Sequence, residues 1–224
     1  MLPEPTTAVV PAEFVWRRIW HLDDHTPEPS TLRTYGPLHR FDPHIGPGAD
    51  GAQECPDGRG VVYLASDWQN AAAEVFGRYQ LSRGQVGEVC PAWRLTEMVP
   101  RADLQLVDLR TDGAMRIGAL PMLGTGAVPR ALSQEWARAI YEDYPDHHGV
   151  LYQGAHVSGD CVALWDRAPA LRTADTYTPD VALQSPPVWQ RLTVFLVGIG
   201  AGTRQIPHEN CARCTPGAEP LALA

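Results

Sequence analysis

The stretch "GRGVVYLASDWQNAAAEVFG", residues 58–77, joins a strand signal directly to a helix signal. Its apolar run VVYLA, residues 61–65, predicts a buried strand. Ser66 and Gln69 then match the S-x-x-Q capping box that opens many helices. Beyond that box, apolar residues recur at spacings of 4, 7, 8 and 11 and predict one buried helical face: Trp68, Ala72, Val75, Phe76 and Tyr79.

Two polar side chains in this stretch are candidates for chemistry. Tyr63 lies within the predicted strand, and Glu74 lies on the flank of the apolar helical face. A carboxylate at such an edge can face a cleft beside the core. The alternatives are that Tyr63 packs in the core and that Glu74 faces solvent, because these are the common roles of a strand tyrosine and a helical glutamate.

The rest of the chain carries more strand signals than helix signals. One helix is expected at residues 131–144, and strands are expected at residues 14–20, 92–98, 104–110, 149–154 and 161–165. Their order is irregular and does not alternate strand with helix, which favours an α+β fold over a doubly wound sheet. The sequence contains neither a G-x-G-x-x-G nor a Walker motif, so the common phosphate loops are absent.

Composition narrows the class of protein. A length of 224 residues suits one domain, and a net charge of −8 argues against direct nucleic-acid binding. All 18 basic residues are arginine, so any anion site must use arginine or backbone N–H groups. The first residues do not resemble a signal peptide, and the longest apolar run, residues 194–202, is too short to span a bilayer. We therefore expect a soluble, cytoplasmic protein with no membrane contact.

The ends of the chain are predicted to lie outside the domain. Residues 1–12 and 208–224 are interpreted as flexible tails, residues 13–207 as a single domain, and residues 45–60 as a loop insertion rich in Gly, Pro and Asp. Cys211 and Cys214 form a C-x-x-C pair, which is half of a zinc site. Because no second cysteine pair exists, we interpret the pair as free thiols and predict no metal, with a zinc-binding interaction module as the distant alternative.

Four blocks in this order resemble the RES domain family: "WRRIW" (16–20), "HRFDPH" (39–44), residues 58–77, and "GVLYQGAHVSGDCVALWDRA" (149–168). Members of that family are toxins of bacterial toxin–antitoxin pairs. The resemblance implies an ADP-ribosyltransferase-like fold, in which two packed β-sheets hold NAD in the cleft between them. It also implies destruction of NAD at the nicotinamide–ribose bond, by phosphorolysis or hydrolysis, and an antitoxin partner of the Xre type.

The resemblance assigns roles residue by residue. The early family arginine falls on Arg17 or Arg18, and Arg18 is favoured because an apolar residue follows it. The implied catalytic residues are Glu74, Tyr63 and Arg40, and the implied NAD-binding residues are Arg18, Arg40, Tyr63 and Gly154. The sequence departs from the family pattern at two positions, where Asp42 replaces an asparagine and Gly154 replaces the family serine.

The chemistry of these residue types is consistent with the assignment. Arginine forks bind phosphates bidentately and stay charged. Breaking an N-glycosidic bond builds positive charge on the ribose, which a carboxylate can stabilise, and a tyrosine can stack on nicotinamide or hydrogen-bond to it. No metal is required, because nicotinamide is already a good leaving group. Two alternatives stay open: transfer of ADP-ribose to a protein, and a catalytically degenerate protein that binds a nucleotide or a partner. An oligomer is possible.

Overall fold

The computed structural model describes residues 1–46, 52–177 and 179–215. Its centre is a nine-stranded sheet of mixed direction. Eight of its strands follow one path, in the order β1 (Thr7–Val10), β8 (Leu104–Asp108), β9 (Gly149–Gln153), β10 (Asp160–Trp165), β5 (Val61–Ala65), β2 (Trp16–His21), β7 (Trp93–Pro100) and β11 (Leu171–Thr173). The ninth, β12 (Asp180–Ala182), also pairs with β7. The predicted α+β class is confirmed.

The sheet consists of two parts that are joined at one point. Strands β5 and β2 share only the registered pair Arg17–Ala65, whereas β2 and β7 pair along six residues of each strand. The β1-to-β5 part and the β2-to-β11 part are therefore held together by very few ladder hydrogen bonds. These two parts correspond to the two sheets that the family resemblance implies.

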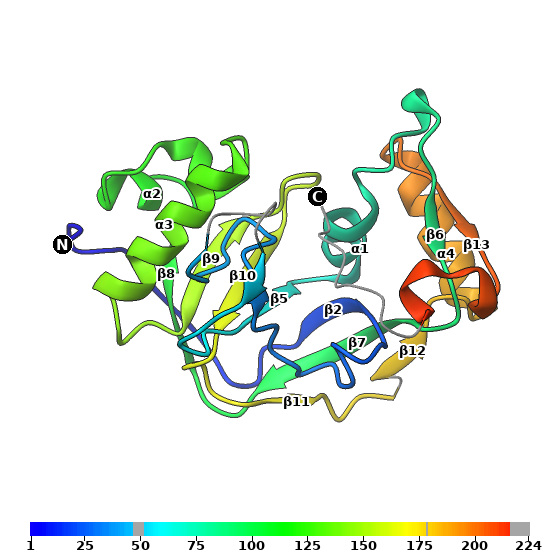
Figure 1. The fold of residues 1–224 in the computed structure, drawn as a ribbon, viewed down its shortest axis with the longest axis horizontal. Helices are drawn as coiled ribbons and strands as arrows, with labels where there is room; N and C mark the ends of the chain where they lie inside the picture. The colour runs from blue at the N-terminus through cyan, green and yellow to red at the C-terminus, as the bar shows by residue number, and fades with distance from the viewer. Residues whose placement is uncertain (47–51, 178, 216–224) are drawn as a thin grey trace.

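Helices cover the sheet at separate places (Figure 1). Helices α2 (Gly113–Arg116) and α3 (Arg130–Asp143) gather at the β8–β9 end, and α1 (Trp68–Phe76) lies over the middle. At the opposite end, α4 (Pro186–Gly198) accompanies the parallel pair β6 (Gly87–Val89) and β13 (Thr203–Gln205). A small antiparallel pair is formed by β3 (Tyr35–Gly36) and β4 (Gln53–Glu54). Short 3-10 turns occur at Leu81–Arg83, Pro121–Thr125, His208–Asn210 and Ala212–Cys214.

The alternation of side chains along β5 decides which face receives the site. Val62 and Leu64 enter the core cluster that also contains Trp16 and Leu164. Successive strand residues point to opposite faces, so Tyr63 projects to the other face, where it packs against the cluster that includes α1, α3 and α4. The strand therefore presents Tyr63 on the face that α1 covers, which is the face that carries Glu74.

Helix α1 forms where the apolar spacing predicts it, but its cap differs from the prediction. Asp67 is the N-cap, and its Oδ1 accepts a hydrogen bond from the Asn70 N–H at 2.8 Å. The Ser66 hydroxyl instead donates to Asp67 Oδ2 at 3.0 Å. The capping box was expected one residue too early, because Ser66 and Asp67 are both good cap residues and only the backbone geometry distinguishes them. Of the predicted apolar face, Ala72, Val75 and Phe76 are buried and Trp68 is half-buried, whereas Tyr79 lies beyond the end of the helix.

The N-terminal segment differs from the expected loose tail. Residues Thr7–Val10 form β1, which pairs antiparallel with β8 at the edge of the main sheet. The Leu2 N–H also donates to Asp143 Oδ2 at 2.6 Å, and the Tyr144 hydroxyl donates to the Pro3 carbonyl. Backbone pairing and contacts to the end of α3 order this segment, and neither leaves an apolar pattern in so short a sequence.

The expected C-terminal tail also differs, as far as residue 215. Cys211 is buried within the larger core cluster, and the Ile206 N–H donates to the Val89 carbonyl at 2.9 Å. Residues 216–224 of the tail and residues 47–51 of the expected insertion lie outside the described residues. Within the remainder of that insertion, β4 pairs with β3, and Cys55 and Arg59 are buried.

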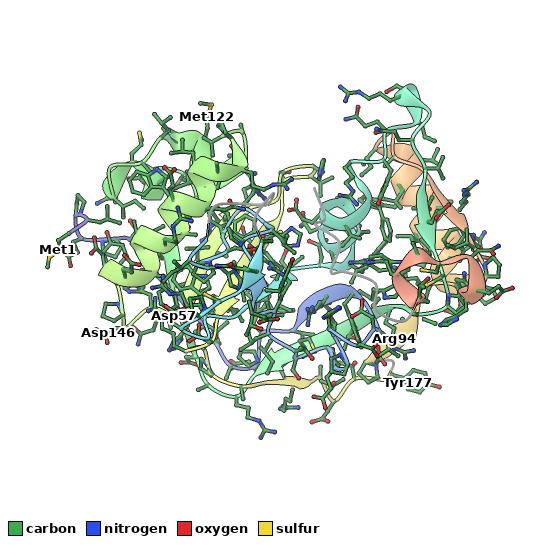
Figure 2. The ribbon with its side chains drawn as sticks, viewed as in Figure 1. Met1, Asp57, Arg94, Met122, Asp146 and Tyr177 are labelled. Carbon is green, nitrogen blue, oxygen red and sulfur yellow. The ribbon has the colours of Figure 1, made fainter. Side chains whose placement is uncertain are left out.

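Exposed apolar side chains are scattered over the periphery, as Met122 and Tyr177 show (Figure 2). Across the described ranges, every helix is too short or too polar to cross a membrane.

Candidate functional site

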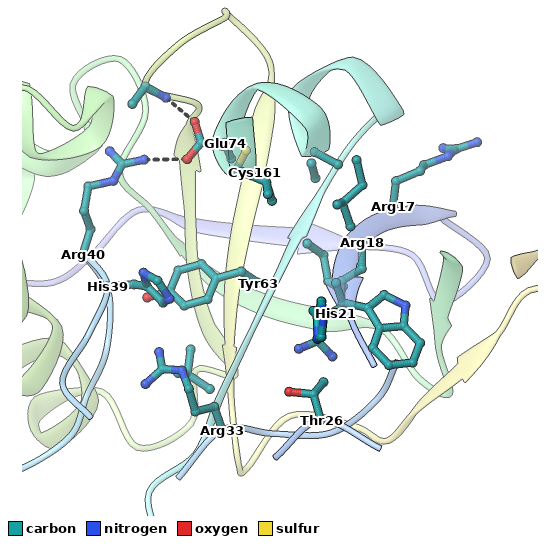
Figure 3. Close-up of a pocket in the computed structure, with 18 of the residues that line it drawn as sticks. Arg17, Arg18, His21, Thr26, Arg33, His39, Arg40, Tyr63, Glu74 and Cys161 are labelled. Atoms are coloured by element: carbon teal, nitrogen blue, oxygen red, sulfur yellow. Dashed lines mark hydrogen bonds and ion pairs between the residues drawn. The ribbon is translucent and has the colours of Figure 1, made fainter. Parts of the chain in front are cut away.

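A cavity of about 490 Å³ lies where the two parts of the sheet meet. Strands β2 and β5, helix α1, the segment around residues 39–40 and the turn at residues 155–156 all contribute side chains to its wall (Figure 3). Its volume is within the range of about 300–1,000 Å³ that small-molecule sites occupy. Four of the five predicted site residues border it: Arg18, Arg40, Tyr63 and Glu74.

Glu74 is held by two donors from different parts of the chain. The Arg40 Nη2 donates to Glu74 Oε2 at 3.2 Å, and the Ala155 backbone N–H donates to Oε1 at 2.7 Å. About a quarter of the Glu74 side chain remains exposed. The helix therefore delivers a carboxylate that is fixed in orientation and still accessible from the cavity.

Arg40 is packed between aromatic rings and a glycine. Its guanidinium lies 4.9 Å from the centroid of the Tyr152 ring and 5.6 Å from that of Phe41, which favours a planar cation. A Cβ atom on Gly126 would come within 1.8 Å of Arg40 Nη1, and Gly126 has a φ of +75°, so the position requires glycine. Nη1 is buried and has no hydrogen-bond partner among the described residues. One donor of this arginine is thus buried and left unsatisfied by the described residues.

Tyr63 makes hydrogen bonds that the sequence does not reveal, in addition to bordering the cavity. Its hydroxyl donates to Asp42 Oδ1 at 2.7 Å and accepts from the Phe41 N–H at 3.0 Å. The hydroxyl therefore anchors the segment that carries Arg40, and the ring contributes the wall of the cavity. The ring of His39 meets that of Tyr63 edge to face, with centroids 5.4 Å apart.

The buried carboxylate of Asp42 fixes the backbone of the same segment, residues 38–41. Its side chain is fully buried and accepts hydrogen bonds from Arg33 Nη2, at 2.7 Å to each oxygen, and from the Leu38 and His39 N–H groups at 2.5 and 2.9 Å. Burial opposes the charge, but Arg33, with smaller contributions from His39 and His44, holds the pKa of Asp42 well below its usual range. The carboxylate at this position is therefore satisfied, and it shapes the backbone on both sides of Arg40.

The two candidate arginines of β2 point to opposite faces. Arg17 also borders the cavity, but its guanidinium is engaged by Glu97, with 3.1 Å between Arg17 Nη2 and Glu97 Oε1, and donates to the carbonyls of Val15 and Ser66 (Figure 3). Arg18 donates through Nη1 to the carbonyls of Pro29 and Thr31. Burial, with a smaller effect of Arg33, lowers the pKa of Arg18 to about 10, so this arginine is still charged at neutral pH.

Gly154, the fifth predicted residue, lies behind Glu74. Its backbone is paired with the turn, since the Gly154 N–H donates to the Gly159 carbonyl at 2.8 Å. A Cβ atom there would lie 3.1 Å from Asn70 Oδ1 and 3.3 Å from Glu74 Oε1. Asn70 Oδ1 is buried and accepts no hydrogen bond from the described residues. A hydroxyl at position 154 would therefore face an unsatisfied acceptor and the Glu74 carboxylate.

Sequence reasoning missed the residues that hold the site together. Arg33, the Ala155 N–H and the α3 side chain Gln134, whose Nε2 donates to the His39 carbonyl at 3.2 Å, carry no motif that could reveal them. Gly126 could have been noticed only as one of many glycines. At the β2 end, the cavity is bordered by His21, Asp23 and Arg213, which belong to a separate cluster of polar side chains.

Two comparisons with known proteins found a match to this chain. None of the curated proteins compared matches the chain. A chain in the crystal structure of the M. tuberculosis MbcT–MbcA toxin–antitoxin complex is similar in fold, with a TM-score of 0.50 and 18% sequence identity, over 85% of this chain and 90% of that one. The sequence pattern of the RES domain matches residues 15–185, a span that contains every predicted site residue. The protein therefore belongs to the RES domain family.

Proposed function

We propose that this protein is a toxin of a toxin–antitoxin pair and that it cleaves the nicotinamide–ribose bond of NAD. The observation that carries the proposal is Glu74, a carboxylate fixed by Arg40 and the Ala155 N–H and accessible from a cavity of small-molecule size. Membership of the RES domain family and the fold shared with a chain of a toxin–antitoxin complex support the same conclusion.

The proposed reaction breaks one bond and forms another at the same ribose carbon. The C–N bond breaks, its electron pair leaves with neutral nicotinamide, and positive charge develops on the ribose ring. The Glu74 carboxylate stabilises this charge, which exists mainly in the transition state. An oxygen of phosphate or water then bonds to the ribose carbon, which gives ADP-ribose 1-phosphate in phosphorolysis, or ADP-ribose and a proton in hydrolysis.

The arginines of the cavity supply the charge that a dinucleotide needs. NAD carries two phosphates, and Arg18 and Arg40 both border the cavity as charged guanidinium groups. Arg40 is only partly committed to Glu74, because its Nη1 has no partner among the described residues, although a shift of the side chain is needed to expose this buried atom to a phosphate. Arg33 is committed to Asp42 and therefore acts by positioning the segment of Arg40.

Gly154 gives a specific reason to retain a non-catalytic alternative. The missing side chain leaves Asn70 Oδ1 without a donor directly behind Glu74. In that alternative, the cavity binds a nucleotide or a partner without cleaving NAD. Transfer of ADP-ribose to a protein uses the same residues and differs only in the acceptor.

The test is incubation of the purified chain with NAD, with and without phosphate, followed by chromatography of nicotinamide and mass spectrometry of the ribosyl product. ADP-ribose 1-phosphate indicates phosphorolysis, free ADP-ribose indicates hydrolysis, and a mass increase on added protein indicates transfer. Absence of nicotinamide release from folded protein, with NAD binding retained, would establish the non-catalytic alternative.

The proposed partner is an antitoxin protein of the Xre type that blocks the cavity, and the proposed location is the cytoplasm. Expression of the chain alone is expected to slow bacterial growth and lower cellular NAD. A Glu74→Gln variant at the same expression level is the control, and it should allow normal growth.

A further inference from the structure

Four side chains from distant parts of the sequence converge beside the cavity. His21 is the last residue of β2, Cys90 follows β6, Cys211 lies between the two C-terminal 3-10 turns, and Cys214 ends the second of them. Their nitrogen and sulfur atoms all lie within 4.8 Å of one another. Three of these residues are buried, and Cys214 is half-buried. All four are present as a histidine and free thiols, with no disulfide among them.

Four of the six separations between these atoms are close to those of a tetrahedral zinc shell. His21 Nε2 lies 3.3, 3.7 and 3.5 Å from the sulfurs of Cys90, Cys211 and Cys214, respectively. The sulfurs of Cys90 and Cys214 are 3.5 Å apart. Zn–S bonds of about 2.3 Å and Zn–N bonds of about 2.0–2.1 Å in a tetrahedron require N···S edges of about 3.6 Å and S···S edges of about 3.8 Å. These four edges match the shell to within about 0.3 Å, and the two sulfur pairs of Cys211 lie within 4.8 Å, so a zinc ion fits at the centre after a displacement of at most about 1 Å at Cys211.

The histidine is oriented as a metal ligand would be. His21 Nδ1 lies 3.1 Å from Asp23 Oδ2, so the ring donates from Nδ1 and directs the lone pair of Nε2 at the three sulfurs. A carboxylate behind a ligating histidine is the usual outer support of a zinc site. Asp23 is itself fixed, because Oδ1 accepts from the His25 and Thr26 N–H groups at 3.1 and 2.8 Å.

We propose that His21, Cys90, Cys211 and Cys214 bind one structural zinc ion. Three thiolates and an imidazole make a complete set of four ligands, and a site with four protein ligands leaves no position for a substrate. Three cysteine ligands also favour zinc over hard cations such as magnesium or calcium. Binding forms three Zn–S bonds and one Zn–N bond and releases the three thiol protons to solvent.

The zinc ion would fasten the C-terminal segment to the rest of the molecule. It connects residues 21 and 214, which are separated by 193 positions, through β2 and the β6–β13 pair. Between the two C-terminal ligands, Arg213 lies 5.0 Å from the centroid of the Trp93 ring and borders the cavity. The ion would therefore hold one wall of the cavity in place. This proposal departs from the expectation of free thiols and no metal.

The decisive measurement is the metal content of the full chain as purified, by inductively coupled plasma mass spectrometry. We expect about one zinc per chain. Replacement by Co²⁺ should add the visible absorption of tetrahedral cobalt together with thiolate-to-cobalt charge transfer. Neither measurement depends on NAD cleavage, so the zinc proposal and the proposed function can fail separately.

Two pairs of variants test the assignment of ligands. Cys214→Ser should lose most of the bound zinc, whereas Cys55→Ser should retain it, because the Cys55 thiol donates to Asp57 Oδ1 and lies outside the cluster. Asp23→Asn should weaken zinc binding by about 10–100-fold. The exposed neighbour Asp24→Asn should leave zinc binding unchanged.

Limited proteolysis tests the consequence for the fold without any variant. Trypsin should cleave after Arg213 slowly in the protein as purified and faster once a chelator has removed the zinc. Iron in place of zinc, or reduced protein without metal and without a cobalt spectrum, would overturn the proposal. A mass two hydrogens lower, which indicates a disulfide within the cluster, would also overturn it.

Discussion

The hydroxyl of Tyr63 and the carboxylate of Asp42 meet at 2.7 Å inside the protein, and the same hydroxyl accepts from the Phe41 N–H. Together they fix the backbone on both sides of Arg40, whose guanidinium holds Glu74. A tyrosine that is predicted to contact the substrate thus also supports the Arg40–Glu74 pair. Its ring borders the cavity, and its hydroxyl fixes the segment that carries Arg40.

Tyr63→Phe therefore tests positioning. Removal of the hydroxyl leaves the Phe41 N–H without its partner and takes away one of the two donors to Asp42 Oδ1, which should lower the free energy of unfolding by about 1–3 kcal/mol. Urea denaturation measures this loss. Tyr141→Phe is the matched control, because its hydroxyl donates to Asp166 at 3.2 Å in an exposed setting and should cost less than about 1 kcal/mol. Equal losses in the two variants would contradict the positioning role.

The lowered pKa of Asp42 leads us to expect that the stability of the fold depends on pH. Its pKa in the folded protein is below its ordinary value of 3.8, so its stabilising contribution is complete above that value and is lost as the pH falls below it. Asp42→Asn should lower the free energy of unfolding at neutral pH by about 3 kcal/mol, because Arg33 loses its buried partner. The difference between the two proteins should shrink between about pH 4 and pH 2. A constant difference over this range would refute the prediction.

Glu74→Gln should separate rate from binding. The amide retains the size of the side chain and loses the charge, so kcat for nicotinamide release should fall by about 10²–10³-fold while the Kd for NAD changes little. Initial rates and isothermal titration calorimetry provide the two numbers. Glu88→Gln, which breaks an exposed pair with Arg204, should leave both unchanged. A Glu74→Gln protein with the normal rate would remove Glu74 from the mechanism.

Arg40→Lys should act mainly on binding and geometry. An ammonium group cannot stack on Tyr152 while it holds Glu74 and offers a second donor to a phosphate. We expect NAD affinity to fall by about tenfold or more, since a charge-assisted hydrogen bond contributes about 1.5–3 kcal/mol. Titration calorimetry measures the affinity. Arg116→Lys, in an exposed pair with Asp112, is the control and should bind NAD normally.

Substitutions at Gly154 test whether the turn around this residue still accommodates a side chain. A Cβ atom on Gly154 would lie 2.9 Å from the Val157 carbonyl oxygen, so Gly154→Ala should destabilise the protein by about 1–3 kcal/mol. Gly154→Ser should recover about 1 kcal/mol of this loss, because its hydroxyl can donate to Asn70 Oδ1. Gly198→Ala is the control, since a Cβ atom there has no neighbour within 4 Å.

The activity of the same two position-154 variants shows whether the glycine has weakened the enzyme. If the glycine has weakened the enzyme, Gly154→Ser should release nicotinamide faster than the natural protein. If the serine variant is stable but slower, the turn has been rebuilt around the missing side chain.

The sequence predicted the elements whose signal is local. Strand β5 begins and ends where its apolar run does, and helix α3, expected at residues 131–144, spans Arg130–Asp143. The strand–helix stretch placed Tyr63 and Glu74 on one face because periods of 2 and 3.6 residues are read directly from the sequence. By contrast, β6 and β13 have three residues each and pair only because the chain between them folds back through α4, which no short pattern records.

The candidate site also contains residues that local motifs predicted and contacts that only the fold reveals. Arg18, Arg40, Tyr63 and Glu74 were found because they lie in four blocks that resemble a family in order. The hydroxyl bond of Tyr63 and the pairing of Arg33 with Asp42 depend on how the segment before β5 folds against that strand. Of the cluster of His21, Cys90, Cys211 and Cys214, only the Cys211–Cys214 pair was noticed. His21 and Cys90 lie 69 positions apart and far from that pair, so no short motif connects them to it.

The RES domain match ends at residue 185, but the cluster of buried residues around the cavity does not. Leu192 and Leu196 of α4, Ala201 and Cys211 all belong to that cluster. A protein cut at the family boundary would uncover the apolar surface beneath α4 and leave β6 without its parallel neighbour β13, which is the kind of bare strand edge that recruits other chains. Such a fragment is expected to aggregate, and its inactivity would say nothing about the chemistry of Glu74.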